Sequence, residues 1–276
     1  MNLAARQPIV MPAFIANLQL SRYVDLVTIV ASRNLKTRYR GSVLGVYWSL
    51  SLPLVMTAVY SLIFGVRFSA DAYYHGSLFN YILACFTGLV VINFFSATTT
   101  QALTSIVGSG SLLNKIRIPV SVFPISVVSA NIFQLLVGVF PVLIIVTLAT
   151  SHSVINVLAL LVPLFALVLV AVGFSLLTSG LFVHFRDLPH LYEVVVFILW
   201  ITSPVFYPPS VIPQVAKPFI DLNPLVAVMN SVRQVALSGN FPDYRLILLA
   251  LIAGVISAIV GALFFLTLKS DFMDLV

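Results

Sequence analysis

One stretch of this chain limits the folds it can adopt more than any other. The 68 residues between Arg117 and Arg186 include no Asp, Glu, Lys or Arg. As a single helix the stretch would be about 100 Å long, whereas the hydrocarbon core of a bilayer is about 30 Å thick. It must therefore double back, and the polar run 150–153 predicts the turn. We expect two membrane-spanning helices, at about 120–148 and 155–182.

The rest of the chain has the same character. Hydrophobic residues make up 61% and charged residues 8% of its 276 residues, and the mean hydropathy is +1.12. These values predict an all-α polytopic membrane protein, because helices satisfy their own backbone hydrogen bonds in lipid. The other uncharged gaps predict four more spans, at about 43–66, 79–100, 191–207 and 246–268.

Between the fifth and sixth spans the sequence is irregular. Residues 210–244 alternate prolines with apolar pieces that are too short to cross a bilayer. Re-entrant half-helices are the expected form. Six crossings would leave both termini on one side, and nothing in residues 1–276 predicts a second domain.

A basic collar precedes the first span. Arg33, Lys36, Arg38 and Arg40 fall within eight residues, and such clusters lie on the cytoplasmic side of membranes, near anionic lipid headgroups. The predicted topology places ten cations inside and four outside, the four being Arg67, Lys217, Arg233 and Arg245. Apolar residues recur at helical spacing over about 20–40, which predicts an amphipathic interface helix.

The sparse polar residues exclude several kinds of protein. The predicted spans contain essentially no ionisable side chain, which disfavours a proton- or sodium-coupled carrier. No GxxxxGK[ST] phosphate loop is present, so ATP hydrolysis would need another chain. The cations lie beside apolar spans and favour lipid or a cytoplasmic partner over nucleic acid.

A metal site is a weak alternative at the fourth loop. Histidines and carboxylates recur every third residue there, at His184, Asp187, His190 and Glu193. Pro189 interrupts the helix that this spacing would need, so we favour a loop that caps two spans and touches a partner.

Aromatic residues near span ends leave two interpretations open. Tyr47, Trp48, Phe206 and Tyr207 fit the aromatic belt of any membrane protein, but aromatic faces also stack on sugar rings. In the same way, the collar residues could be topology anchors or could receive a lipid-linked pyrophosphate.

Four segments resemble a known family. They are LKTRYRGSVLG at 35–45, LNKIRIP at 113–119, FRDL at 185–188 and NPL at 223–225. Together with the order of the spans, they resemble the membrane subunits of ABC exporters that move lipid-linked polysaccharides, such as O-antigen and teichoic acid exporters.

The resemblance implies a homodimer in the bacterial cytoplasmic (inner) membrane, with two copies of a cytoplasmic ATPase that holds ATP and Mg. No cofactor is expected in this chain. A coupling helix would lie at about 104–117. The expected ATPase-coupling residues are Arg33, Lys36, Lys115, Arg117, Arg186 and Asp187. The expected substrate-path residues are Arg38, Tyr39, Arg40, Tyr47, Trp48, Phe206 and Tyr207.

Three other functions remain as alternatives at this stage. An ABC exporter of a smaller lipid or drug would keep the same architecture. A membrane-embedded transferase acting on lipid-linked sugars would need an acid–base pair, and His75 with Asp71 is the outer candidate. A structural scaffold would stimulate no partner ATPase.

Overall fold

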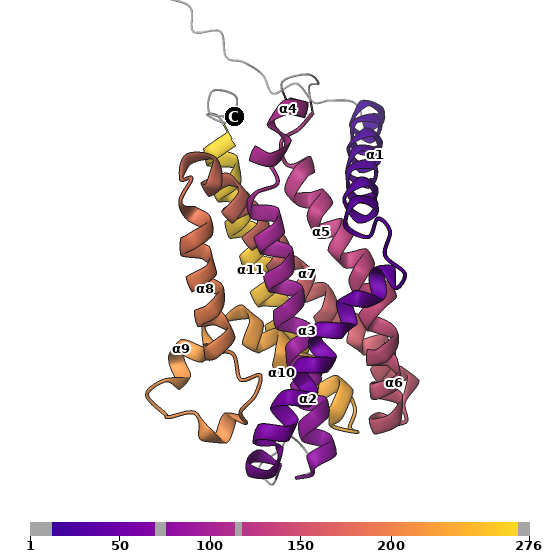
Figure 1. Ribbon diagram of the computed structural model, residues 1–276, viewed down its shortest axis with the longest axis vertical. Helices are drawn as coiled ribbons and strands as arrows, with labels where there is room; N and C mark the ends of the chain where they lie inside the picture. Colours follow the sequence, from indigo (N-terminus) through magenta and orange to yellow (C-terminus); the bar gives the residue numbers. More distant parts are fainter. Residues whose placement is uncertain (1–12, 70–75, 114–117, 270–276) are drawn as a thin grey trace, which may run out of the picture.

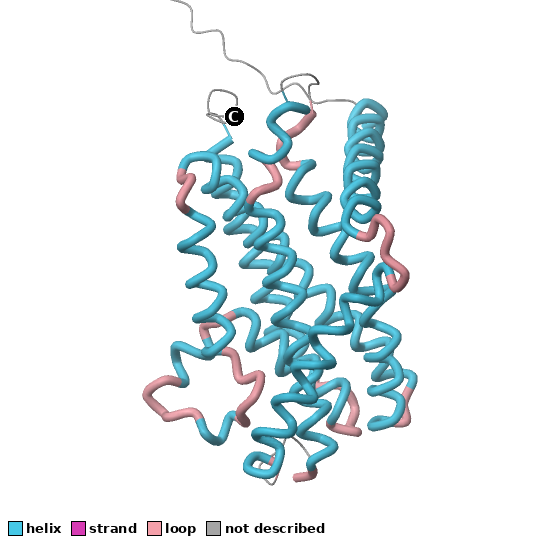
Figure 2. The backbone as a smooth tube through the Cα atoms, in the orientation of Figure 1, coloured by secondary structure: helices cyan, strands magenta, loops and turns pink. Residues whose placement is uncertain are grey.

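The computed structural model describes residues 13–69, 76–113 and 118–269, and helices make up most of this part of the chain (Figure 2). The α-helices, labelled in Figure 1 where there is room, are α1 (Ala13–Arg38), α2 (Trp48–Phe68), α3 (Leu78–Leu103), α4 (Gly110–Leu113), α5 (Val122–Gln134), α6 (Phe140–Ser151), α7 (Val154–His184), α8 (Leu188–Thr202), α9 (Lys217–Asp221), α10 (Pro224–Leu237) and α11 (Tyr244–Leu268). Shorter helical turns are η1 (Gly45–Tyr47), η2 (Val107–Ser109), η3 (Leu135–Val139) and η4 (Pro209–Val211). Within these ranges no residue forms a strand.

Five helical stretches of the described chain are long and apolar enough to cross a membrane. They are Gly45–Phe68, Leu78–Leu103, Val122–Ser151, Val154–His184 and Tyr244–Leu268. The prediction of an all-helical polytopic protein is therefore confirmed.

The third of these stretches is built from α5 and α6, joined by η3. η3 is a π-helical turn that ends just before Pro141. A π turn changes the hydrogen-bond register, and this keeps the stretch helical next to a residue that has no N–H to donate.

The remaining apolar helix, α8, is shorter than the expected fifth span. It has 15 residues and ends at Thr202, two residues before Pro204. Such a helix is about 22 Å long, less than the thickness of the hydrocarbon core. The sixth crossing therefore stays a prediction. A loop follows α8 and contains η4 and α9, and the chain then enters α10.

Side-chain caps fix where three helices begin. Ser77 Oγ accepts a hydrogen bond from the Asn80 N–H at the start of α3, over 3.2 Å. Asn223 and Asp243 accept from the N–H groups of Leu225 and Arg245 in the same way, at the starts of α10 and α11. Each cap satisfies a donor that the first helical turn leaves unpaired.

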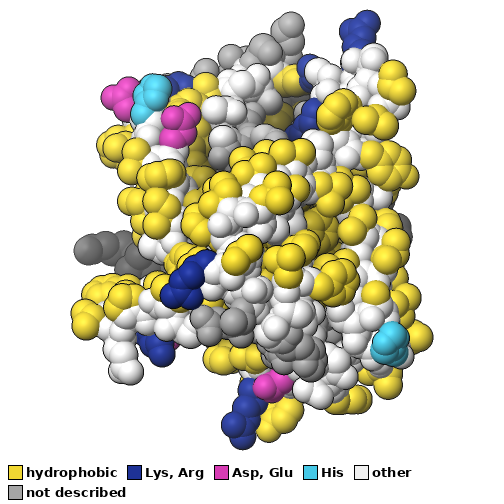
Figure 3. All heavy atoms as spheres, turned by 60° about the horizontal axis from the view of Figure 1, so that its bottom comes forward, with side chains coloured by type: hydrophobic (Ala, Val, Ile, Leu, Met, Phe, Trp, Pro, Cys, Tyr) yellow, Lys and Arg dark blue, Asp and Glu magenta, His cyan; other side chains and the backbone are white. Residues whose placement is uncertain are grey.

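The helices differ widely in how much protein surrounds them. In α3, 78% of the most apolar 18-residue window is buried, whereas the share is 17% in the stretch that contains α2 and 17% in α11. Large hydrophobic side chains such as Leu62 and Val66 of α2 face outward, and hydrophobic side chains cover much of the face in Figure 3. α3 is thus the central helix, while α2 and α11 present apolar surface for lipid or another subunit.

Glycines bring α7 and α11 close together. A Cβ on Gly173 would collide with the backbone of Ser257, and a Cβ on Gly261 would collide with the backbone of Gly173. Close backbone approach at small residues is a common way for helices to associate in membranes, where lipid removes the hydrophobic driving force between them. This pair forms one side of the core.

The N-terminal helix α1 packs beside α5 (Figure 1). Of the apolar residues at helical spacing, Val27 and Ala31 are buried, whereas Leu20 and Val24 remain exposed. The contact therefore involves only part of the predicted apolar stripe.

Arg233, which the predicted topology counts among the four outer cations, lies inside the protein and not at its surface. It lies in α10 and is fully buried, and α10 packs against α3, α6, α7 and α11. The prolines of this segment predict half-helices, and the 14 residues from Pro224 to Leu237 form one continuous helix that is largely buried. The interior therefore does hold an ionisable side chain.

Candidate functional site

The collar arginine Arg38 connects three helices. Its Nη1 donates to Asn131 Oδ1 over 3.0 Å and to Gln134 Oε1 over 2.8 Å, and its Nη2 donates to Gln101 Oε1. Asn131 Nδ2 also donates to Gln101 Oε1 over 3.1 Å. Because Gln101 belongs to α3 and the other two amides to α5, Arg38 fixes the end of α1 against the central helix.

Two cavities adjoin these hydrogen bonds. One, of about 480 Å³, lies between α1, α3 and α5 and is lined by Arg33 and Arg38. The other, of about 230 Å³, is lined by Trp48 and by the Arg38 acceptors Asn131 and Gln134. The structure thus brings Arg38 and Trp48, both expected in the substrate path, into one neighbourhood.

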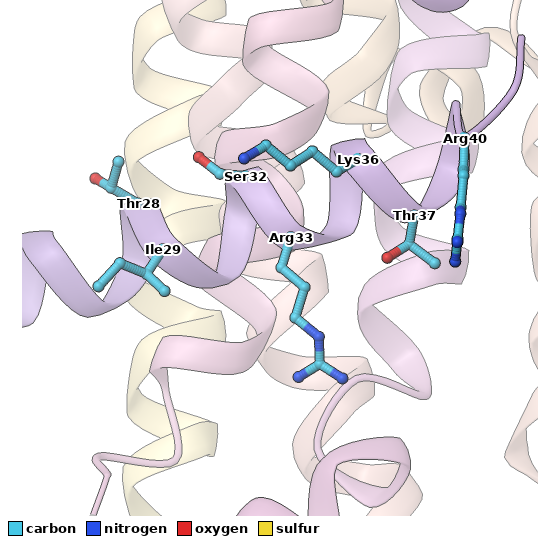
Figure 4. A pocket seen from close by; sticks show the side chains of 7 residues that line it. All are labelled: Thr28, Ile29, Ser32, Arg33, Lys36, Thr37 and Arg40. Atoms are coloured by element: carbon cyan, nitrogen blue, oxygen red, sulfur yellow. The ribbon is translucent and has the colours of Figure 1, made fainter.

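The exposed side of α1 carries a row of cations that we call the basic stripe: Arg33, which also borders the cavity beside Arg38, Lys36 and Arg40. Together with the hydroxyls of Thr28, Ser32 and Thr37 they border a shallow hollow of about 530 Å³ on the helix surface. Figure 4 shows these side chains along the exposed side of α1. The stripe has the hydrogen-bond donors that an anionic or carboxylate-bearing partner needs.

Aromatic rings line a groove between α2 and α8, which we call the aromatic groove. The Tyr60 and Phe206 rings stack with centroids 3.6 Å apart and an interplanar angle of 22°, and Trp200 lies 5.9 Å from Phe206. The groove has a volume of about 490 Å³ and also contains Tyr207 and Glu193. Stacked faces next to a carboxylate suit a sugar, which offers C–H faces and hydroxyl donors.

The remaining predicted residues occupy separate places. Tyr47 is exposed in η1, before α2, and Tyr39 is half-buried after α1. Arg186 and Asp187 form the turn between α7 and α8, where the Arg186 guanidinium lies 5.8 Å from the Phe182 ring centre. Lys115 and Arg117 lie outside the described residues.

The elements predicted to face the cytoplasm gather at one end of the molecule. Figure 1 shows α4, the α7–α8 turn and the last turn of α11 at the same end. The predicted coupling helix, 104–117, is described up to residue 113, where it consists of η2 and the single turn α4.

The metal alternative gains no support. No three His, Cys, Asp or Glu side chains in the described ranges lie close enough together to hold a metal ion. The helix breaks between His184 and Leu188, which puts His184 on α7 and Glu193 on α8. The transferase candidates His75 and Asp71 lie outside the described residues.

Sequence reasoning missed several residues of these sites. Gln101, Asn131 and Gln134 were not singled out, although polar amides in otherwise apolar spans are a usable signal. Tyr60, Trp200 and Glu193 were not assigned to the groove, because their neighbours come from helices far apart in the sequence.

Comparison with known proteins agrees with the resemblance to ABC exporter membrane subunits, and it does so over most of the chain. Residues 25–237 match the ABC-2 type transporter family. Two proteins from Klebsiella pneumoniae named O-antigen export system permease protein RfbA are 27% and 29% identical, each over 91% of this chain and 95% of their own length. A Myxococcus xanthus protein of the same name is 29% identical over 82% of this chain and 85% of its own length. The family match covers α2 to α10 and most of α1, so this chain belongs to the ABC-2 type transporter family.

Proposed function

We propose that this chain is the transmembrane subunit of an ABC exporter that moves a lipid-linked polysaccharide of the O-antigen type out of the cytoplasm. The observation that carries the proposal is the likeness to three O-antigen export permeases, over 82–91% of this chain and 85–95% of each relative. Apolar spans and the aromatic groove are compatible with this substrate class.

The proposed assembly is a homodimer in the inner membrane with two copies of a separate cytoplasmic ATPase, which supplies the ATP and Mg sites. Each subunit is a single domain with six crossings, the fifth being α8 extended by the loop that follows it. The termini lie in the cytoplasm, and the segment from α9 to α10 is re-entrant. The sparsely buried α2 and α11 offer apolar surface for subunit contact and lipid.

The two ends of the molecule take different tasks in this proposal. Arg33 and Lys36 of the basic stripe contact the ATPase, together with Arg186, Asp187 and the region of Lys115 and Arg117. Arg38, Tyr39, Arg40, Tyr47 and Trp48 lie near the entry of the lipid-linked head, and Phe206 and Tyr207 contact the sugars. Closure of the ATPases on nucleotide would tilt the spans and bias a two-state path.

Deletion and complementation test the function. In a strain that lacks this chain, polysaccharide should accumulate on the cytoplasmic side, and export should return with the intact chain and its native ATPase. An ATPase variant that cannot hydrolyse ATP is the control and should block export. Normal surface polysaccharide in the deletion strain would refute the proposal.

A further inference from the structure

The backbone just after α8 is irregular, yet it is enclosed by protein. Ser203, Pro204 and Val205 are buried, and the helical hydrogen-bond pattern ends at Thr202. Irregular backbone at membrane depth needs partners for its carbonyl groups, because lipid provides none. The donors that bind these carbonyls therefore show which residues hold the irregular backbone in place.

Six consecutive carbonyls, from residue 201 to residue 206, all accept hydrogen bonds. The carbonyls of Ile201 and Thr202 accept from Tyr207 O–H, over 2.9 and 3.3 Å, and the Ser203 carbonyl accepts from Val205 N–H over 2.7 Å. The Pro204 carbonyl accepts from Arg233 Nη1 over 2.8 Å, and the Val205 carbonyl accepts from Arg233 Nη2 over 3.2 Å. The Phe206 carbonyl accepts from Tyr81 O–H over 2.7 Å. Side chains supply all but one of these donors. We call the irregular segment 203–206 the break. Its conformation is therefore determined by the side chains of Tyr207, Arg233 and Tyr81.

Arg233 holds the break to the rest of the protein. Besides the two carbonyls of the break, its Nε and Nη2 donate to the Ala84 carbonyl of α3, over 3.2 and 2.9 Å. The guanidinium thereby connects α10, α3 and the end of α8. Charge-assisted bonds of this kind are about twice as strong as neutral ones.

A glycine on α3 leaves room for this guanidinium. A Cβ on Gly88 would lie 2.7 Å from Arg233 Nη2, closer than packing allows, and 3.3 Å from the Val205 side chain. The two residues thus form a matched pair, since a larger residue at 88 would displace the guanidinium from its carbonyls.

The held backbone leads directly into the aromatic groove. Phe206 follows the two carbonyls that Arg233 binds, and its own carbonyl is held by Tyr81. Its ring stacks on Tyr60 of α2 and lies near Trp200 of α8. A shift of the break would therefore move the ring that joins the two walls of the groove.

We infer that Arg233 is a positioning residue: by binding the carbonyls of Ala84, Pro204 and Val205, it fixes the break after α8 and sets Phe206 in the wall of the aromatic groove. That the groove carries sugars rests on the proposed function, but the position of Phe206 can be measured without it. A side chain with no role beyond general stability would leave Trp200 in its normal surroundings whenever the protein folds.

Trp200 provides that measurement. The chain has two tryptophans, Trp48 and Trp200, so a Trp48→Phe background leaves Trp200 as the single reporter. In this background, Arg233→Met, Arg233→Lys and Gly88→Ala are purified in lipid nanodiscs and compared by Trp200 emission and acrylamide quenching. Arg245→Met is the matched control, because it removes an exposed arginine at the start of α11.

We expect Arg233→Met and Gly88→Ala to increase quenching of Trp200 and shift its emission to longer wavelength. Arg233→Lys should give an intermediate signal, since lysine keeps the charge but cannot reach all three carbonyls, and Arg245→Met should match the background. If Arg233→Met does not fold, the Trp200 signals of Gly88→Ala and Arg233→Lys test the inference in its place. An unchanged Trp200 signal in the variants that fold would overturn the inference.

Export of polysaccharide by the same variants, measured with Trp48 restored, separates the two claims. A changed Trp200 signal with reduced export supports both. A changed signal with normal export keeps the positioning role and refutes the sugar path through the groove.

Discussion

Arg38 and Arg233 are both arginines that join helices, but their surroundings differ in kind. Arg38 is exposed and binds the side-chain amides of Gln101, Asn131 and Gln134. Arg233 is fully buried and binds the backbone carbonyls of Ala84, Pro204 and Val205. Amide side chains can rotate to other partners or to water, whereas carbonyls of a buried backbone cannot. The comparison indicates an adjustable contact near the basic stripe and a rigid one beside the aromatic groove.

We expect the largest loss of stability when the rigid contact made by Arg233 is removed. Arg233→Met should lower the free energy of unfolding by about 3 kcal/mol or more, because it leaves buried carbonyls without donors. Arg38→Met should lower it by about 1 kcal/mol, since water can replace the arginine. Thermal unfolding of both variants in the same detergent measures the difference. Equal losses would remove the distinction between the two arginines.

A smaller effect is expected from filling the space beside Arg233. Gly88→Ala should destabilise by about 1–3 kcal/mol, as overpacking in a core does. Gly108→Ala is the matched control, because a Cβ there has no atom within 4 Å. If the two alanine variants unfold at the same temperature, the guanidinium is not confined by Gly88.

Weakening the adjustable contact made by Arg38 should change the local motion of α1 more than the stability of the protein. The double variant Gln101→Leu, Gln134→Leu removes two of the three amide acceptors of Arg38 and leaves only the Asn131 oxygen. We expect faster hydrogen exchange in α1, with a change of less than about 1 kcal/mol in overall stability. Unchanged exchange in α1 would show that its packing on α5 suffices to hold it.

The smallest effect on folding is expected at the basic stripe. Arg33→Glu with Lys36→Glu alters exposed side chains, so stability should change by less than about 0.5 kcal/mol. Binding of the ATPase should nevertheless weaken, because the change reverses charge on the proposed contact surface. Arg67→Glu with Lys217→Glu, exposed cations assigned to the opposite side, is the control. Equal ATPase binding by both double variants would exclude the stripe from the interface.

Much of the fold follows from the sequence, because charges are costly in lipid and the gaps between them mark the spans. Five predicted spans coincide with helices for this reason. The burial of Arg233 could not be read in the same way. Its acceptor at Ala84 is 149 positions away in the sequence, and the proline pattern around α10 does not show which side chains the protein encloses.

The sites were predictable only in part. The aromatic positions of Phe206 and Tyr207 and the cations of α1 are visible as local patterns. Their partners are not, because Arg38 meets Gln101 and Gln134 across 63 and 96 residues, and Tyr60 meets Phe206 only through the packing of α2 against the break. Local periodicity carries no information about such contacts.

The central claim is that this chain works with a separate ATPase, and co-purification tests it most directly. The tagged chain is isolated from its native membrane in mild detergent, and the bound proteins are identified and quantified. We predict a nucleotide-binding ATPase in about a one-to-one ratio with this chain. Purification of the chain without any ATPase, under conditions where it stays folded, would contradict the account.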